Sequence, residues 1–168
     1  MEKTSGLLDR FRSFGAIVLL SVVAAVIYGI VHDQITVRIC LEYFTVGHPL
    51  IFGNQSPTVL AILWGIVATW WMGLFLGIIL ALASTLGSNP VITARSLVRP
   101  LLRLLAVMAV SAAIAGAIGF GLTSSTYMAD AFAHEASYAV GFLGGLALAI
   151  KTWIVRVRQA KTDKISTL

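Results

Sequence analysis

Four long apolar stretches, separated by shorter polar segments, run along the chain. They cover about residues 14–31, 58–86, 100–122 and 137–157, and each can form a helix across a hydrocarbon core about 30 Å thick. The second stretch is longer than that thickness requires, so we expect it to tilt or to project beyond the membrane. The pattern predicts an all-α membrane protein with a single domain, a four-helix transmembrane bundle.

The first apolar stretch has the basic flank of a secretory signal, because Lys3, Arg10 and Arg12 precede it. Its apolar run of about 18 residues is longer than the core of a signal peptide, which has about 7–15 residues. The run ends at residues 28–31 without a cleavage site of the Ala-x-Ala kind. We therefore expect an uncleaved membrane anchor.

Basic residues divide the polar segments into two classes. Of the 12 Lys and Arg residues, all except Arg38 lie near the N-terminus, around the loop between the second and third stretches, or near the C-terminus. Positively charged segments beside a span stay on the side where insertion begins. This division predicts that both termini are cytoplasmic and that the two remaining loops are periplasmic.

Composition supports a membrane protein and limits what else the chain contains. Hydrophobic residues make up 58% and charged residues 11% of the chain, whereas soluble domains carry about 25% charged residues. Four spans use about half of the residues, so we expect no separate soluble domain. The formal charge of +5 comes from residues beside the spans. We therefore interpret it as contact with the lipid bilayer surface, not with nucleic acid.

The first outer loop, residues 32–57, is long for a plain connector. Apolar and polar residues alternate over residues 35–40, a period of two that is typical of a strand. Residues 42–46 continue in an extended style until Gly47, His48 and Pro49 break it. We expect a short β-hairpin in this periplasmic loop, lying on the membrane surface and anchored by its aromatic side chains.

Small residues spaced four apart mark expected helix contacts, because lipid-embedded helices associate through close packing. They predict tight packing of the last three helices, or of a homo-oligomer. The pairs are Gly73 with Gly77, Ala112 with Gly116, Ala115 with Gly119, and Gly141 with Gly145.

Trp70 and Trp71 fall near the middle of the second stretch, away from the membrane interface that Trp usually occupies. We expect them to pack between helices. The alternative is that they form a wall for a hydrophobic ligand such as a quinone.

The outer loops hold the residues that could carry chemistry, because all three histidines and four acids lie there. Mixed imidazole and carboxylate sets suit zinc, manganese or non-haem iron. Asp130 and His134 are four residues apart, so a helical turn would bring them onto one face. We hypothesise that His48, His134, Glu42 and Asp130 converge on a divalent metal ion. Further candidates are His32, Asp33 and Glu135.

A structural polar network is the alternative to a metal site. Polar residues at an outer interface are often solvated or paired with one another, and Arg38 could pair with Asp33 or Glu42.

Several classes of function lack their usual residues. The central portions of the spans contain no acid and no histidine, which disfavours a pump or transporter. No Gly-x-Ser-x-Gly elbow, phosphate loop, dinucleotide fingerprint or haem-attachment motif occurs in the sequence. Cys40 is the only cysteine, so an intramolecular disulfide is excluded.

The first outer loop contains a run of polar and aromatic residues: Asp33-Gln34-Ile35-Thr36, Arg38, Glu42-Tyr43-Phe44-Thr45, Gly47 and His48. In these residues the chain resembles a family of small bacterial four-span inner-membrane proteins. The resemblance implies a bacterial inner-membrane location and importance of this loop, and it brings no established catalytic residue, substrate or cofactor.

These observations favour a binding or accessory component that acts through its periplasmic surface, with a homo-oligomer or another membrane protein as partner. The first alternative is a membrane enzyme whose periplasmic metal site uses the outer histidines and acids. The second is a small oligomeric transporter or channel.

Overall fold

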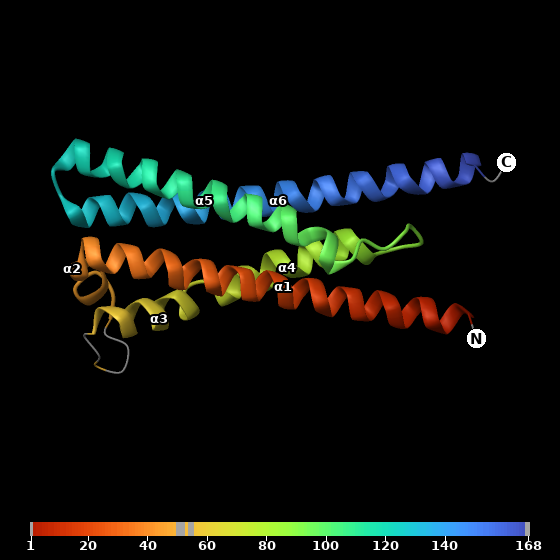
Figure 1. Cartoon of the computed structure of the whole chain (residues 1–168), viewed down its shortest axis with the longest axis horizontal. Helices are drawn as coiled ribbons and strands as arrows, with labels where there is room; N and C mark the ends of the chain where they lie inside the picture. The colour runs from red at the N-terminus through yellow and green to blue at the C-terminus, as the bar shows by residue number, and fades with distance from the viewer. Residues whose placement is uncertain (1, 50–52, 54–55, 167–168) are drawn as a thin grey trace.

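The structure, a computed structural model, describes residues 2–49, 53 and 56–166. Figure 1 shows an elongated helical bundle in which α1 begins and α6 ends at the same end, the terminal end. The opposite end, called the distal end, contains α2 and the turn between α5 and α6. The described helices are α1 (Glu2–Ile39), α2 (Leu41–Thr45), α3 (Pro57–Val67), α4 (Trp70–Thr85), α5 (Ala94–Thr123) and α6 (Thr126–Ser166).

Four segments of these helices are long and apolar enough to cross a membrane: Gly6–Ile39, Pro57–Thr85, Ala94–Thr123 and Thr126–Thr162. They cover the four apolar stretches almost completely, which confirms the prediction of an all-helical fold suited to a bilayer. With 38 residues, α1 is about 57 Å long at 1.5 Å per residue. Since the hydrocarbon core is about 30 Å thick, part of α1 must project beyond it.

The predicted β-hairpin is replaced by helix. Residues 35–39 form the last turn of α1, and residues 41–45 form α2, so the predicted strand is wrong. The buried positions explain the difference: Asp33, Thr36, Val37 and Cys40 are buried and follow the i, i+3, i+4, i+7 period of a helix. The apolar side chain of Ile35, which suggested a strand face, is 59% exposed.

The second apolar stretch is interrupted at Ala68 and Thr69, between α3 and α4. The Thr69 amide donates to the Ile66 carbonyl at 3.3 Å, an i to i−3 bond, and its hydroxyl donates to the Gly65 carbonyl at 2.5 Å. Hydroxyl bonds of this kind bend helices. The break leaves the Ala68 carbonyl free to accept a bond from the Tyr138 hydroxyl of α6, at 3.4 Å.

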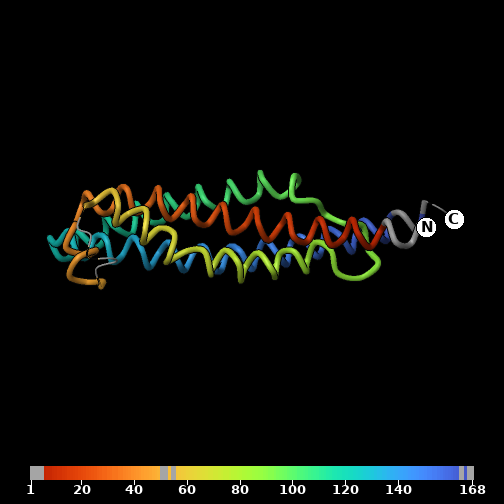
Figure 2. The backbone as a smooth tube through the Cα atoms, turned by 90° about the horizontal axis from the view of Figure 1, so that it is seen from below, coloured from red at the N-terminus to blue at the C-terminus, as the bar shows by residue number. Residues whose placement is uncertain are grey.

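Glycine contacts join α1 to α3 and α4, which lie along it in Figure 2. A Cβ on Gly65 would lie 2.5 Å from the Ile30 amide nitrogen, and one on Gly29 would lie 2.6 Å from the Gly65 carbonyl oxygen. A Cβ on Gly73 would lie 2.8 Å from the Cβ of Ala25, and one on Gly77 would lie 2.8 Å from the Cβ of Ser21, both on α1. The small face of α4 therefore packs on α1, whereas the sequence predicts packing among the last three helices or in a homo-oligomer.

The predicted small pairs on α5 contact α6 through Gly116 and Gly119. On α6, Gly141 faces Met108 of α5, whereas Gly145 faces Leu76 of α4. A Cβ on Gly116 would lie 3.2 Å from the Ala129 carbonyl oxygen, and one on Gly119 would lie 2.8 Å from the Met128 carbonyl oxygen. The bundle is thus built from two close pairs of spans. In one pair α1 packs on the span formed by α3 and α4, and in the other α5 packs on α6.

Trp70 and Trp71 take neither of the roles predicted for them. Their side chains are 47% and 48% exposed on the outside of the bundle. They do not appear among the residues that line the main cavity. In a bilayer these indoles would face lipid.

A buried arginine holds the terminal end together. Arg156 of α6 is fully buried, and its guanidinium caps the carbonyls where α4 ends and the following loop begins. Arg10 of α1 adds bonds to the Thr85 and Asn89 carbonyls at 2.7 and 3.0 Å. α6 continues beyond this arginine to Ser166. The carbonyls bonded by Arg156 are Pro90 at 2.7 Å, Ala83 at 2.8 Å, and Leu86 and Asn89 at 3.1 Å.

The structure predicts a different outcome for two glycine substitutions. Gly65→Ala should lower the free energy of unfolding by about 1–3 kcal/mol, because the added methyl group overpacks against the α1 backbone. Gly121→Ala meets nothing within 4 Å and should be neutral or gain up to about 1 kcal/mol from helix propensity. Thermal unfolding of both variants in one detergent measures this, and equal melting temperatures would contradict it.

The arginine contacts give a second prediction. Arg156→Ala should destabilise the protein by about 1–3 kcal/mol, because buried carbonyls lose their donor. Arg158→Ala removes the same charge from an exposed position two residues further along α6, so it serves as the matched control. Thermal unfolding and amide exchange over residues 83–93 report the loss. If both variants behave alike, the buried contacts do not stabilise this end.

Candidate functional site

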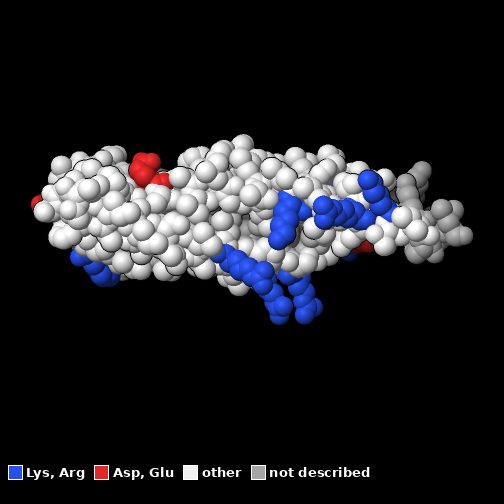
Figure 3. Space-filling model, turned by 90° about the horizontal axis from the view of Figure 1, so that it is seen from above, with Lys and Arg blue, Asp and Glu red and all other residues white. Residues whose placement is uncertain are grey.

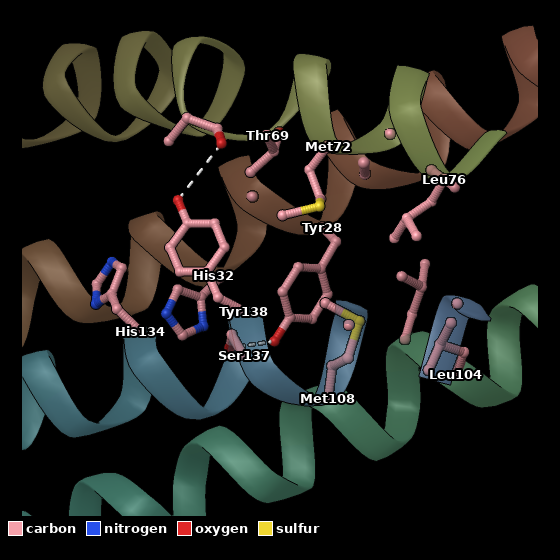
Figure 4. Close-up of a pocket in the computed structure, with 18 of the residues that line it drawn as sticks. Tyr28, His32, Thr69, Met72, Leu76, Leu104, Met108, His134, Ser137 and Tyr138 are labelled. Atoms are coloured by element: carbon pink, nitrogen blue, oxygen red, sulfur yellow. Dashed lines mark hydrogen bonds between the residues drawn. The ribbon is translucent and has the colours of Figure 1, made fainter. Parts of the chain in front are cut away.

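A cluster of two histidines and an aspartate lies between α1 and α6 toward the distal end. His32 and Asp33 come from α1, and His134 comes from α6. The Nε2 atom of His134 lies 3.3 Å from Oδ1 of Asp33. One ligand atom from each of the three residues can be chosen so that all lie within 4.8 Å of one another. Figure 4 shows the two imidazoles side by side at one end of a pocket.

The backbone of α6 fixes the ring of His134. Its Nδ1 lies 2.8 Å from the Asp130 carbonyl oxygen, which can only accept, so Nδ1 carries the hydrogen. Nε2 then faces the Asp33 carboxylate, and two lone pairs in contact would repel. A hydrogen, carried by Nε2 or by the carboxyl group, or a metal ion must therefore lie between these atoms.

His32 brings a polar atom that has no protein partner. Its Nε2 is buried and forms no hydrogen bond within the described part of the chain. The His32 ring meets the His134 ring edge-on, with centroids 4.6 Å apart, and stacks on Tyr28 at 5.7 Å. Buried imidazole nitrogens normally have a partner, so this atom points to a bound group.

Aromatic side chains from α2 and the loop after it cover the cluster. Tyr43 stacks on His134 with centroids 4.6 Å apart, and His48 packs between Tyr43 and Trp64 at 4.8 and 4.9 Å. Phe44, which is 2% exposed, holds α2 against the bundle. Burial raises the pKa of the Tyr43 phenol, so its hydroxyl stays protonated at neutral pH.

The structure brings together a different set from the four residues predicted to bind metal. Of the predicted four, only His134 belongs to the cluster. The other two members, His32 and Asp33, were further candidates. The ring of His48 is turned toward Trp64, with its Nδ1 2.8 Å from the Tyr43 carbonyl oxygen. Glu42 is exposed, as is the further candidate Glu135.

Asp130 does not join the cluster through its side chain. The residue is fully buried, and its two carboxylate oxygens have no hydrogen-bond partner among the described residues. Its contribution to the site is the backbone carbonyl that orients His134. The four-residue spacing of Asp130 and His134, which predicted two ligands on one face, instead places the Asp130 carbonyl next to the His134 ring.

Several polar residues of the site were not identified from the sequence. The hydroxyls of Tyr28 and Ser137 form a 2.8 Å hydrogen bond between α1 and α6, and Tyr138 reaches the Ala68 carbonyl. A signal for them exists: Tyr28 lies four residues before His32, and Ser137 lies three after His134. Helical spacing therefore puts each on the same face as a cluster histidine.

An apolar cavity of about 150 Å³ continues from the histidines into the bundle. Figure 4 shows Met72, Leu76, Leu104 and Met108 around its other end. The site thus combines a polar layer with an apolar interior. Comparisons of the chain with protein-family models, curated proteins and solved structures find no match.

Proposed function

We propose that this chain is a multi-pass membrane protein that binds a divalent transition-metal ion at the distal end of its bundle, as a binding or accessory component. The observation that carries the proposal is the convergence of His32, Asp33 and His134 within 4.8 Å. Two imidazoles and one carboxylate form a donor set that zinc, manganese and ferrous iron accept.

One of the three ligand distances already suits a small ion. Ligand atoms bound tetrahedrally at about 2.0–2.1 Å lie about 3.3–3.4 Å apart. The contact between His134 and Asp33 already has this length, at 3.3 Å. The carbonyl bond to Nδ1 of His134 is the usual outer support of a metal-bound imidazole, because it directs Nε2 to the ion.

A bacterial inner membrane with both termini in the cytoplasm is part of the same proposal. The Lys and Arg residues, with Arg38 as the exception, flank the terminal ends of the spans. On the face drawn in Figure 3, most basic side chains lie toward the terminal end. The positive-inside rule then assigns the distal end, and with it the metal site, to the periplasmic side.

One observation favours an enzyme as a second candidate. Catalytic zinc sites hold the ion with three protein ligands and keep a fourth position open for water or substrate. The cluster offers three ligands and adjoins a cavity. A hydrolytic activity that requires the bound ion would support this candidate.

Topology can be tested by cysteine labelling in a Cys40→Ala background. The exposed Glu135 and Arg158, toward the distal and terminal ends of α6, provide the labelled positions. Glu135→Cys should react with a membrane-impermeant maleimide added to intact cells, whereas Arg158→Cys should react only after lysis. The reverse pattern would contradict cytoplasmic termini.

Metal binding is tested with the full chain in detergent after treatment with a chelator. Added zinc should bind at one ion per chain. It should raise the free energy of unfolding by about 2.7 kcal/mol when the free zinc concentration is about a hundred times Kd. His32→Ala and Asp33→Asn should lose this effect, and His48→Ala should keep it. Binding should weaken from about pH 7.5 to about pH 5.5, because protons compete for imidazole nitrogen.

Two results would reject the metal proposal. One is the absence of zinc binding to the wild-type chain. The other is an equal loss of binding in His48→Ala, because that ring lies outside the cluster and its loss should leave the three donors in place.

A further inference from the structure

The cavity beside the histidines is enclosed by helices from both pairs of the bundle. Its lining includes residues of α1, α4, α5 and α6, from Ser21 and Leu80 at one end to His32 and His134 at the other. Its volume of about 150 Å³ has room for about five water-sized groups, at about 30 Å³ for each. A methylene group is of similar size, so the cavity fits a short alkyl chain.

The cavity has one polar end and one apolar end, as Figure 4 shows. Tyr28, Thr69 and Ser137 bring hydroxyls to the polar end, where His32 has an unpartnered nitrogen. Met72, Leu76, Leu104 and Met108 surround the apolar end. This distribution matches a ligand with a head and a tail.

The cavity runs along the bundle for a distance comparable to one lipid leaflet. Its lining on α1 extends from Ser21 to Asp33, twelve helical steps or about 18 Å. One leaflet contributes about 15 Å to the hydrocarbon core. A chain that enters with its head at the histidines would thus lie parallel to the lipid tails.

The charges around the cavity indicate an uncharged head. Asp33, three histidines and three tyrosines are the ionisable residues of its lining, and no Lys or Arg occurs among the described lining residues. A buried anion without a cationic partner carries a large desolvation cost. Hydroxyl and imidazole groups, in contrast, can bond a neutral oxygen-bearing head.

Two glycines of α6 maintain the space. A Cβ on Gly141 would lie 2.9 Å from the methyl carbon of Met108, and one on Gly145 would lie 2.8 Å from Cδ1 of Leu76. Larger residues at these positions would push the tips of Met108 and Leu76 into the cavity. Methionine side chains are flexible, so the wall can adapt to a chain that enters.

We propose that this cavity binds one uncharged single-chain amphiphile, with an alkyl chain among Met72, Leu76, Leu104 and Met108 and an oxygen-bearing head beside Tyr28 and His32. The inference goes beyond the metal ion and does not rest on it, because the apolar lining alone receives the chain.

The test uses the full chain in phosphatidylcholine vesicles with a chelator present, so that it is independent of metal binding. The probe is 1-pentanol that carries a diazirine near its chain end. Irradiation should label Met72, Leu104 or Met108, and a tenfold excess of unlabelled 1-pentanol should reduce this labelling about tenfold by mass action. Leu143, 65% exposed on α6, reports lipid contact and should not show competition.

Two comparisons make the test specific. Gly141→Leu should lower cavity labelling severalfold, whereas Gly121→Leu, which meets open space, should keep it. A pentyl phosphate with the same diazirine should label the cavity severalfold less than the alcohol, because its head is anionic.

Cavity labelling that excess 1-pentanol does not reduce would overturn the proposal. Equal or stronger labelling by the phosphate would overturn the uncharged head. If Gly141→Leu does not fold, the competition experiment on the wild-type chain still decides.

Discussion

The close approach of Gly29 and Gly65 is the constraint on which the rest of the structure depends. No side chain separates the α1 and α3 backbones there, since a Cβ on either glycine would lie within 2.6 Å of the other helix. Just beyond this contact the helix breaks, where the Thr69 hydroxyl bonds the Gly65 carbonyl. The break frees the Ala68 carbonyl for Tyr138 and places Thr69 beside the cavity. Site and cavity thus both adjoin one backbone contact.

Polar contacts hold the two helix pairs together at both ends of the bundle. At the terminal end Arg156 of α6 binds carbonyls at the end of α4, and at the distal end His134 of α6 meets Asp33 of α1. Lipid offers helices little hydrophobic reason to associate, so polar contacts and close packing must supply it. Because both ends are held, the middle of the bundle can remain open without loss of the fold. The apolar cavity occupies that middle.

The sequence predicted the helical fold because the length of an apolar stretch directly encodes a membrane span. It did not predict the cluster, because the alternation over residues 35–40 was interpreted as a strand. A hairpin that begins there leaves His32 and Asp33 in a loop, whereas the observed helix presents both to α6. The buried positions Asp33, Thr36 and Val37 held the helical signal. Glycine pairs were visible too, but which helix each would meet depends on the arrangement of helices.

His32 belongs to both the cluster and the cavity, so the two proposed ligands cannot act independently. Thermodynamic linkage makes their effects reciprocal. If the bound amphiphile changes the affinity for the ion by some factor, the bound ion changes the affinity for the amphiphile by the same factor. If the head oxygen completes the coordination of the ion, each ligand strengthens the other. If head and ion compete for the same imidazole nitrogen, each weakens the other. The sign of this coupling therefore identifies whether the apolar ligand supports metal binding or displaces the metal.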